Sequence, residues 1–161
     1  MNKKDWLWAL AFPFYLLIGT LRHEMSHAVV AALEGAQILE IVFWPTLNAK
    51  GGIQWGYVRW QGDTDWLCLA APYFCDLLIG IITLIILMLI SMHRHWLWIN
   101  LMAIGLASPI VNSAFNYILG SDGVKLRAAI PPMWVHGYFF ITIFFYIGAL
   151  GLVLLRSLEE T

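Results

Sequence analysis

Charged residues are scarce in this sequence. Only 12% of its 161 residues are charged and 61% are hydrophobic, against roughly 25% and about 45–50% in a typical soluble domain. The formal net charge is −1, so there is no excess of positive charge with which to bind nucleic acid. The mean hydropathy of +0.75 also indicates a strongly apolar chain. The composition therefore predicts an integral membrane protein and excludes an electrostatic nucleic-acid binder, and the length predicts a single domain over residues 1–161.

Cysteine is scarce as well, and repeats, low-complexity tracts and long linkers are missing. Cys68 and Cys75 lie seven positions apart in one predicted helix, a separation of about 10 Å along the axis that excludes a disulfide between them. The charged start and apolar run of residues 1–19 have the pattern of a secretory signal peptide. Because the apolar character continues past residue 19, we expect an uncleaved membrane helix instead.

Long hydrophobic segments are what the sequence does contain. Four of them are long enough to cross a bilayer, at about 6–33, 65–92, 95–120 and 131–156, since about 20 apolar residues suffice. Between the first and second lie "QILEIVF" and "IQWGYVRW", separated by the turn string "NAKGG". The predicted fold is an all-α, multi-pass membrane protein with four transmembrane helices and a membrane-associated β-hairpin between the first two.

The direction of these segments brings their polar residues to one side of the membrane. We call the membrane face at which the first helix begins side A and the opposite face side B. Three polar features then lie towards side B: the string "HEMSH" near the end of the first helix, the hairpin, and the string "GSDG" after the third helix. Side A carries four lysines and arginines and side B carries five, so the positive-inside rule assigns no orientation.

The string "HEMSH" has the spacing of a catalytic metal site. His23 and His27 are four residues apart, so on a helix they share one face and can bind one metal ion. Glu24 follows the first histidine and matches the general base of the H-E-x-x-H arrangement, in which zinc is the usual metal. Ionisable residues inside a membrane helix are costly and usually functional. There are three alternatives. The first is a buried polar cluster in which Glu24 pairs with Arg22 or a histidine. The others are a site for another metal and a haem site.

A third ligand is needed for such a site. Asp122 is the best candidate, because it follows the third helix and lies between Gly120 and Gly123, which allow the backbone to bend. The alternative is that "SDG" only makes a turn. The other acidic candidates on side B are Asp63, Asp65, Glu34 and Glu40.

These motifs together resemble the site-2 protease family of intramembrane zinc metalloproteases. The matching strings are "HEMSH" at 23–27, the hairpin around Gly51 and Gly52, "AAP" at 70–72 and "SDG" at 121–123, in the family's order over residues 15–125. The family's Asn-x-x-Pro before the aspartate is absent, because Pro109 precedes both Asn112 and Asn116.

The resemblance implies a metal-dependent hydrolase in a cell membrane that cleaves peptide bonds in or near transmembrane segments of other membrane proteins. Zn²⁺ would be bound by His23, His27 and Asp122, and Glu24 would be the catalytic base. We expect substrate contacts at Asn112, Asn116, Gly51 and Gly52, although the two asparagines serve equally well as hydrogen-bonding residues between helices. The family also implies a site on the cytoplasmic side.

Three other interpretations stay open. The first is a non-proteolytic member of the same fold that acts as an assembly or regulatory partner of membrane proteins, and the second is a small transporter or channel. The third, haem binding, predicts a visible Soret band. A regulatory subunit or an oligomer is compatible with each of these interpretations.

Overall fold

The computed structural model describes residues 7–47, 51–90 and 95–159 of the chain. These residues form α-helices, one π-helical segment and four strands. In chain order, the first elements are α1 Leu7–Leu33, β1 Gln37–Val42, β2 Thr46–Leu47, β3 Ile53–Gln54, β4 Tyr57–Gln61 and α2 Trp66–Leu89. The remaining elements are α3 His95–Met102, the π-helix η1 Ala103–Ala107, α4 Ser108–Ile118, α5 Ser121–Ala129 and α6 Pro132–Glu159, which brings the α-helices to six.

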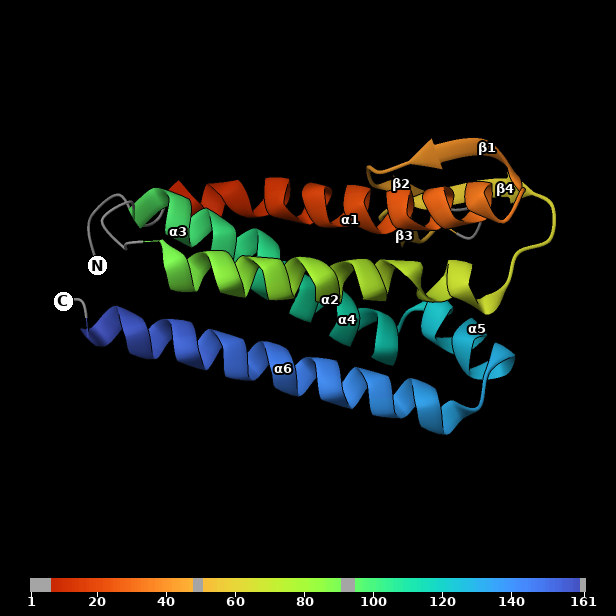
Figure 1. Cartoon of the computed structure of the whole chain (residues 1–161). Helices are drawn as coiled ribbons and strands as arrows, with labels where there is room; N and C mark the ends of the chain where they lie inside the picture. The colour runs from red at the N-terminus through yellow and green to blue at the C-terminus, as the bar shows by residue number, and fades with distance from the viewer. Residues whose placement is uncertain (1–6, 48–50, 91–94, 160–161) are drawn as a thin grey trace.

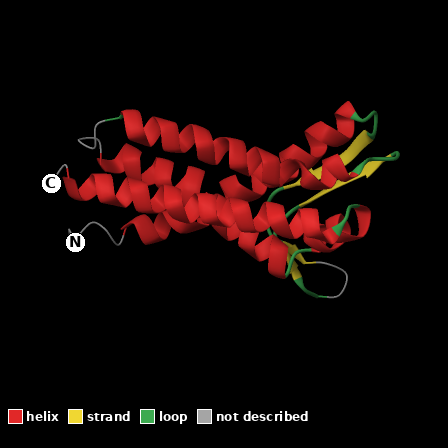
Figure 2. Ribbon diagram, turned by 60° about the horizontal axis from the view of Figure 1, so that its bottom comes forward, coloured by secondary structure: helices red, strands yellow, loops and turns green. Residues whose placement is uncertain are grey.

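The long helices lie lengthwise beside one another. The start of α1 and the end of α6 lie at one end of the molecule, and the strands and α5 lie at the opposite end (Figure 1). The second view shows the same division, with the strands gathered at the end away from both termini (Figure 2). We call this end the strand end of the bundle and the other the terminal end.

Three helical stretches among the described residues are long and apolar enough to cross a membrane. They are Trp66–Leu89, Trp96–Ile118 and Pro132–Ser157, with mean hydropathies of 2.3, 1.4 and 2.3. The first predicted span forms the helix α1, but its polar residues near "HEMSH" lower its hydropathy, and it is not among these three stretches. The three stretches indicate a membrane protein.

The third predicted span is not one regular α-helix. The π-helical segment η1 interrupts it at Ala103–Ala107. Here Arg22 of α1 donates a hydrogen bond from Nη1 to the carbonyl oxygen of Ile104 at 3.1 Å. Wide turns of this kind often lie at functional sites, and this one gives a partly buried arginine of α1 a backbone acceptor.

The segment between α1 and α2 forms two small antiparallel sheets. β1 pairs with β4, with an irregularity between Ile38 and Glu40, and β2 pairs with β3. The expected turn string is only partly visible, because residues 48–50 lie outside the described residues. Gly51 has a φ of 77°, a left-handed conformation that glycine adopts without strain.

Apolar side chains form three separate buried clusters. At the terminal end, the distal cluster consists of Leu87, Trp98, Leu106, Tyr146, Ala149 and Val153. At the strand end, a second cluster consists of Ala70, Tyr73, Leu126, Val135 and Phe139, and a third joins Ala31, Ala36 and Cys68 beneath the sheet. The polar residues of α1 lie at the strand end, near the second and third clusters.

Candidate metal centre

The polar residues of α1 lie on its buried face. His23, Glu24 and His27 are 7%, 9% and 5% exposed, and the neighbouring positions Met25 and Val29 are exposed. This alternation follows the helical period, which places positions three and four residues apart on one face. α1 therefore turns its ionisable residues towards the other helices, where they need polar partners.

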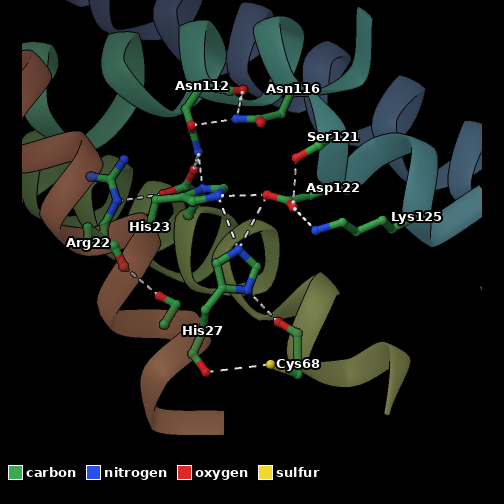
Figure 3. A network of polar contacts seen from close by, with 11 residues as sticks. Arg22, His23, His27, Cys68, Asn112, Asn116, Ser121, Asp122 and Lys125 are labelled. Carbon is green, nitrogen blue, oxygen red and sulfur yellow. Dashed lines mark hydrogen bonds and ion pairs between the residues drawn. The ribbon is translucent and has the colours of Figure 1, made fainter. Parts of the chain in front are cut away.

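Asp122 of α5 completes a group of three facing donor atoms with the two histidines (Figure 3). Its Oδ2 atom lies 3.2 Å from Nε2 of His23 and 3.4 Å from Nε2 of His27, and the two Nε2 atoms are 3.2 Å apart. Bond lengths of 2.0–2.2 Å in a tetrahedral zinc site place neighbouring ligand atoms about 3.4 Å apart. The three atoms therefore have the spacing of ligands that share one small metal ion.

Two glycines allow α5 to approach α4 closely enough for this contact. A Cβ atom added to Gly120 would lie 2.3 Å from Oδ1 of Asn116. One added to Gly123 would lie 2.7 Å from the backbone carbonyl oxygen of Asn116. No side chain fits at such distances. The string "GSDG" therefore packs its backbone directly on Asn116, and this contact fixes where Asp122 begins the first turn of α5.

The surroundings of Asp122 favour its charged form. Burial by itself raises the pKa of this carboxyl, but hydrogen bonds and charge interactions with His23 and His27 outweigh it and hold the pKa well below the usual range. Lys125 lies on the other side, with Nζ 3.8 Å from Oδ1 of Asp122. One carboxylate oxygen thus faces the histidines while the other faces a cation.

The ring of His27 is held by a backbone carbonyl. Its Nδ1 atom lies 2.7 Å from the carbonyl oxygen of Cys68, and a carbonyl can only accept a hydrogen bond. Nδ1 therefore carries the hydrogen, and in the neutral ring Nε2 has a free lone pair. This is the arrangement in which a histidine binds a metal through Nε2.

The ring of His23 has a different neighbour. Its Nδ1 atom lies 3.2 Å from the amide nitrogen of Asn112, and the same nitrogen donates to Oδ2 of Asp76 at 2.7 Å. Asp76 is fully buried and forms an ion pair with Nε of Arg22 at 2.5 Å. A chain of polar contacts thus runs from Arg22 through Asp76 and Asn112 to His23.

Glu24 lines a polar cleft beside the three donor atoms. The cleft has a volume of about 420 Å³, and its other lining residues are His27, Gln54, Gly56, Tyr57, Val58, Arg59, Trp60, Ser121, Asp122 and Lys125. A Cβ atom at Gly56 would lie 2.6 Å from Cγ2 of Thr20 and 3.0 Å from Oε1 of Glu24. Glycine at position 56 therefore lets the chain between β3 and β4 pass close to the Glu24 carboxylate.

The structure brings His23, His27 and Asp122 together, as the sequence analysis expects, and this group could hold a metal ion. Two of the other acidic candidates, Glu34 and Glu40, have different partners. Glu34 accepts a hydrogen bond from the backbone nitrogen of Asp65 at 2.9 Å, and Glu40 accepts from Arg59 and from Tyr57. These acids lie in loop and strand contacts, away from the histidine pair.

The four residues expected to contact substrate lie in two different places. Asn112 and Asn116 belong to the network behind His23, where Asn116 donates to Oδ1 of Asn112 at 2.9 Å. Gly51 and Gly52 are exposed and do not line the cleft, whose wall on that side contains Gln54 and Gly56 instead.

Sequence reasoning missed two important partners. It considered Arg22 as a partner of Glu24, but Arg22 pairs with Asp76 of α2, which lies 54 positions further along the chain. It also did not identify the Cys68 carbonyl as the partner of His27. Every residue has a backbone carbonyl, so residue type does not show which carbonyl accepts a hydrogen bond. The signal for the first was present, because a buried arginine and a buried aspartate in two membrane-like helices require partners.

Comparison of the chain with known protein families, with curated proteins and with solved structures finds no match.

Proposed function

We propose that this protein is an intramembrane zinc metalloprotease, with His23, His27 and Asp122 as the metal ligands and Glu24 as the catalytic base. One observation carries the proposal. Three donor atoms of suitable type lie within 4.8 Å of one another, and Glu24 lines the same cleft as His27 and Asp122. The second residue of an H-E-x-x-H string is the one whose carboxylate acts as the base in metalloproteases.

The donor set suits zinc. Two imidazole nitrogens and one carboxylate oxygen are the kind of three-residue set that catalytic zinc sites use, with the fourth position left for water or substrate. When bound, the ion would supply the Lewis acidity that polarises a peptide carbonyl and lowers the pKa of water. Glu24 then accepts a proton from the attacking water and passes it to the leaving amine. Its low exposure of 9% keeps that carboxylate out of bulk solvent.

The strand β4 is the proposed docking edge for an unwound substrate. β4 pairs with β1 along one edge, and four consecutive residues, Tyr57 to Trp60, line the cleft. Because alternate side chains of a strand point to opposite faces, four consecutive lining residues indicate that an edge of the strand borders the cleft. A substrate segment added there as a strand would pass beside Glu24. The proposed substrate contacts of the sheets therefore lie at β4 instead of at Gly51 and Gly52.

We place α1 in the membrane as a fourth span beside the three apolar stretches, with the sheets at the membrane boundary. The protein would then be a multi-pass protein of a cell membrane, and its substrate a segment of another membrane protein that reaches the cleft through the bilayer.

The decisive experiment compares the protein with its Glu24→Gln variant. Both are reconstituted in liposomes with single-span membrane proteins, and products are identified by mass spectrometry. We expect cleavage by the protein and a rate about 10²–10⁴-fold lower for the variant, because general base catalysis contributes about that factor. Zinc content should be the same in both, since Glu24 is not a proposed ligand.

Glu34→Gln is the matched control. Glu34 accepts a hydrogen bond from the Asp65 backbone, and the amide oxygen of glutamine can still accept it, so this variant should cleave at the unchanged rate. If the protein and Glu24→Gln leave every substrate equally intact while both bind zinc, the protease proposal is wrong and a non-proteolytic partner of membrane proteins takes its place.

A further inference from the structure

The hydrogen bonds around Asn116 determine how the side-chain amide of Asn112 is turned. The amide nitrogen of Asn116 donates to the backbone carbonyl oxygen of Asn112 at 3.1 Å, and this oxygen can only accept. The same nitrogen also donates to the side chain of Asn112 at 2.9 Å, so the atom of Asn112 that faces Asn116 is Oδ1. The atom that faces His23 and Asp76 is therefore the amide nitrogen.

Asp76 requires the same orientation. Its Oδ2 atom lies 2.7 Å from the Asn112 nitrogen, and its Oδ1 atom pairs with Arg22. A carboxylate beside an arginine accepts hydrogen bonds and donates none. Turning the amide over would place two oxygens 2.7 Å apart in a buried site, which is unfavourable.

This orientation has a consequence for His23. The amide nitrogen has two hydrogens. One points to Asp76 and the other can reach Nδ1 of His23 at 3.2 Å, which must then accept. The neutral ring consequently carries its hydrogen on Nε2, where it points to Oδ2 of Asp122 at 3.2 Å. A metal at Nε2 requires the other tautomer, with the hydrogen on Nδ1, and that hydrogen would face the amide hydrogens of Asn112.

We propose that Asn112, held by Asp76 and Asn116, is a positioning residue that favours the Nε2–H tautomer of His23 and thereby lowers the metal affinity of the centre. This inference rests on the proposed metal site and deepens it. The two histidines differ in this respect, because the Cys68 carbonyl favours the metal-binding tautomer of His27. One ligand is prepared for the metal, and the other is held in a competing hydrogen bond.

The contacts suggest a variant in which Asp76 and Asn112 exchange residue types, Asp76→Asn with Asn112→Asp. The exchange keeps one carboxylate and one amide in the network, so the number of atoms and the total charge do not change. The carboxylate at position 112 would accept from Nδ1–H of His23, from the amide at position 76 and from Asn116. The amide oxygen at position 76 would accept from Arg22. Each of the four present contacts, from Arg22 to position 76, between positions 76 and 112, from Asn116 to position 112 and between position 112 and His23, then has a counterpart with His23 in its metal-binding tautomer.

Zinc affinity of the protein and of the exchange variant tests the proposal. Both are purified in detergent, and affinity is measured by competition with a chromophoric chelator. Outer carboxylate partners of ligating histidines typically change metal affinity by about 10–100-fold, so we expect the exchange variant to bind zinc about 10–100-fold more tightly. Equal or weaker binding by a folded exchange variant would overturn the proposal.

A second measurement uses the unsubstituted protein and does not depend on how the variant folds. Nitrogen-15 NMR of histidine-labelled protein, with chelator and then with zinc, reports which ring nitrogen of His23 carries the hydrogen. Loss of signals in a His23→Gln sample assigns the resonances. We expect Nε2–H for His23 in chelator and Nδ1–H after zinc is added, and Nδ1–H for His27 in both. An Nδ1–H form of His23 in chelator contradicts the proposal.

The two proposals fail in different ways. If the unsubstituted protein binds no zinc, the proposed function is wrong, and the tautomer of His23 in chelator still tests the role of Asn112. If the protein binds zinc but the exchange variant binds no more tightly, the metal site stands and the role of Asn112 is wrong.

Discussion

The two ends of the helical bundle are built by different interactions. At the terminal end, the distal cluster packs Leu87, Leu106, Val153 and their neighbours, and none of its members is an acid, a base or a histidine. At the strand end, six ionisable residues meet: Arg22, His23, Glu24, His27, Asp76 and Asp122. Apolar packing is non-directional and tolerates changes that conserve volume. Polar contacts in a buried site have direction, and each missing partner leaves a group unsatisfied.

This contrast implies that the two ends can be perturbed separately. A change at the strand end should affect metal binding more than folding, and a change in the distal cluster should do the opposite. The candidate centre and the distal cluster share the helix α2, which contributes Asp76 to one end and Leu87 to the other. Variants at each end therefore test whether this division holds.

The largest effect is expected for Asp122→Ala. This substitution removes the only carboxylate among the three facing donor atoms. Because removal of outer partners already costs about 10–100-fold in metal affinity, loss of a ligand should lower zinc affinity by more than about 100-fold. The measurement is zinc competition in detergent. Asp63→Ala removes an exposed aspartate and should leave the affinity unchanged. Undiminished zinc binding by Asp122→Ala would show that Asp122 is not a metal ligand.

An effect of intermediate size is expected for Leu87→Ala, which should lower the stability of the fold and leave zinc affinity unchanged. The Leu87 side chain is 1% exposed in the distal cluster. Lipid is as apolar as leucine, so the cost comes mainly from the cavity, and we expect a loss of about 2 kcal/mol in the free energy of unfolding. Unfolding in mixed micelles with added dodecyl sulfate measures it. Leu89→Ala in the same helix is the control, since Leu89 is 79% exposed. A loss of zinc affinity in Leu87→Ala equal to that of Asp122→Ala would refute the separation of the two ends.

The smallest effect is expected for Arg59→Gln, at the rim of the cleft. Arg59 lies 3.3 Å from Glu40, but the two side chains are 69% and 42% exposed. Exposed ion pairs contribute about 0–1 kcal/mol, so the thermal unfolding temperature and the zinc affinity should hardly change. A large loss of zinc affinity would show that the rim of the cleft belongs to the centre itself.

Much of the centre could be predicted from residue patterns. The spacing of His23 and His27 places both on one face of any helix that contains them. Asp122 could be predicted because chain direction brings the end of the third hydrophobic segment to the same end as "HEMSH". The irregular elements could not be predicted in this way. The π-helix η1 and the division of the strands into two sheets follow from contacts between segments that are distant in sequence.

The residue partners of the centre were the least predictable part. Arg22 pairs with Asp76 across two helices, whereas short-range spacing offered only Glu24 as a partner. Asn112 and Asn116 both lie in α4, but their link to His23 depends on how α4 packs against α1 and α2. Position in the sequence does not specify such rotations of one helix against another.

The sequence by itself determined the helical, membrane-like character of this protein and the residue types of its centre, because hydropathy and helical periodicity are local properties of the chain. Only the tertiary structure decided which hydrogen-bond partner stands behind each histidine, a carbonyl for His27 and an amide nitrogen for His23. The physical reason is that hydrogen bonds have direction and act over about 3 Å, so their partners are chosen by the final packing of helices.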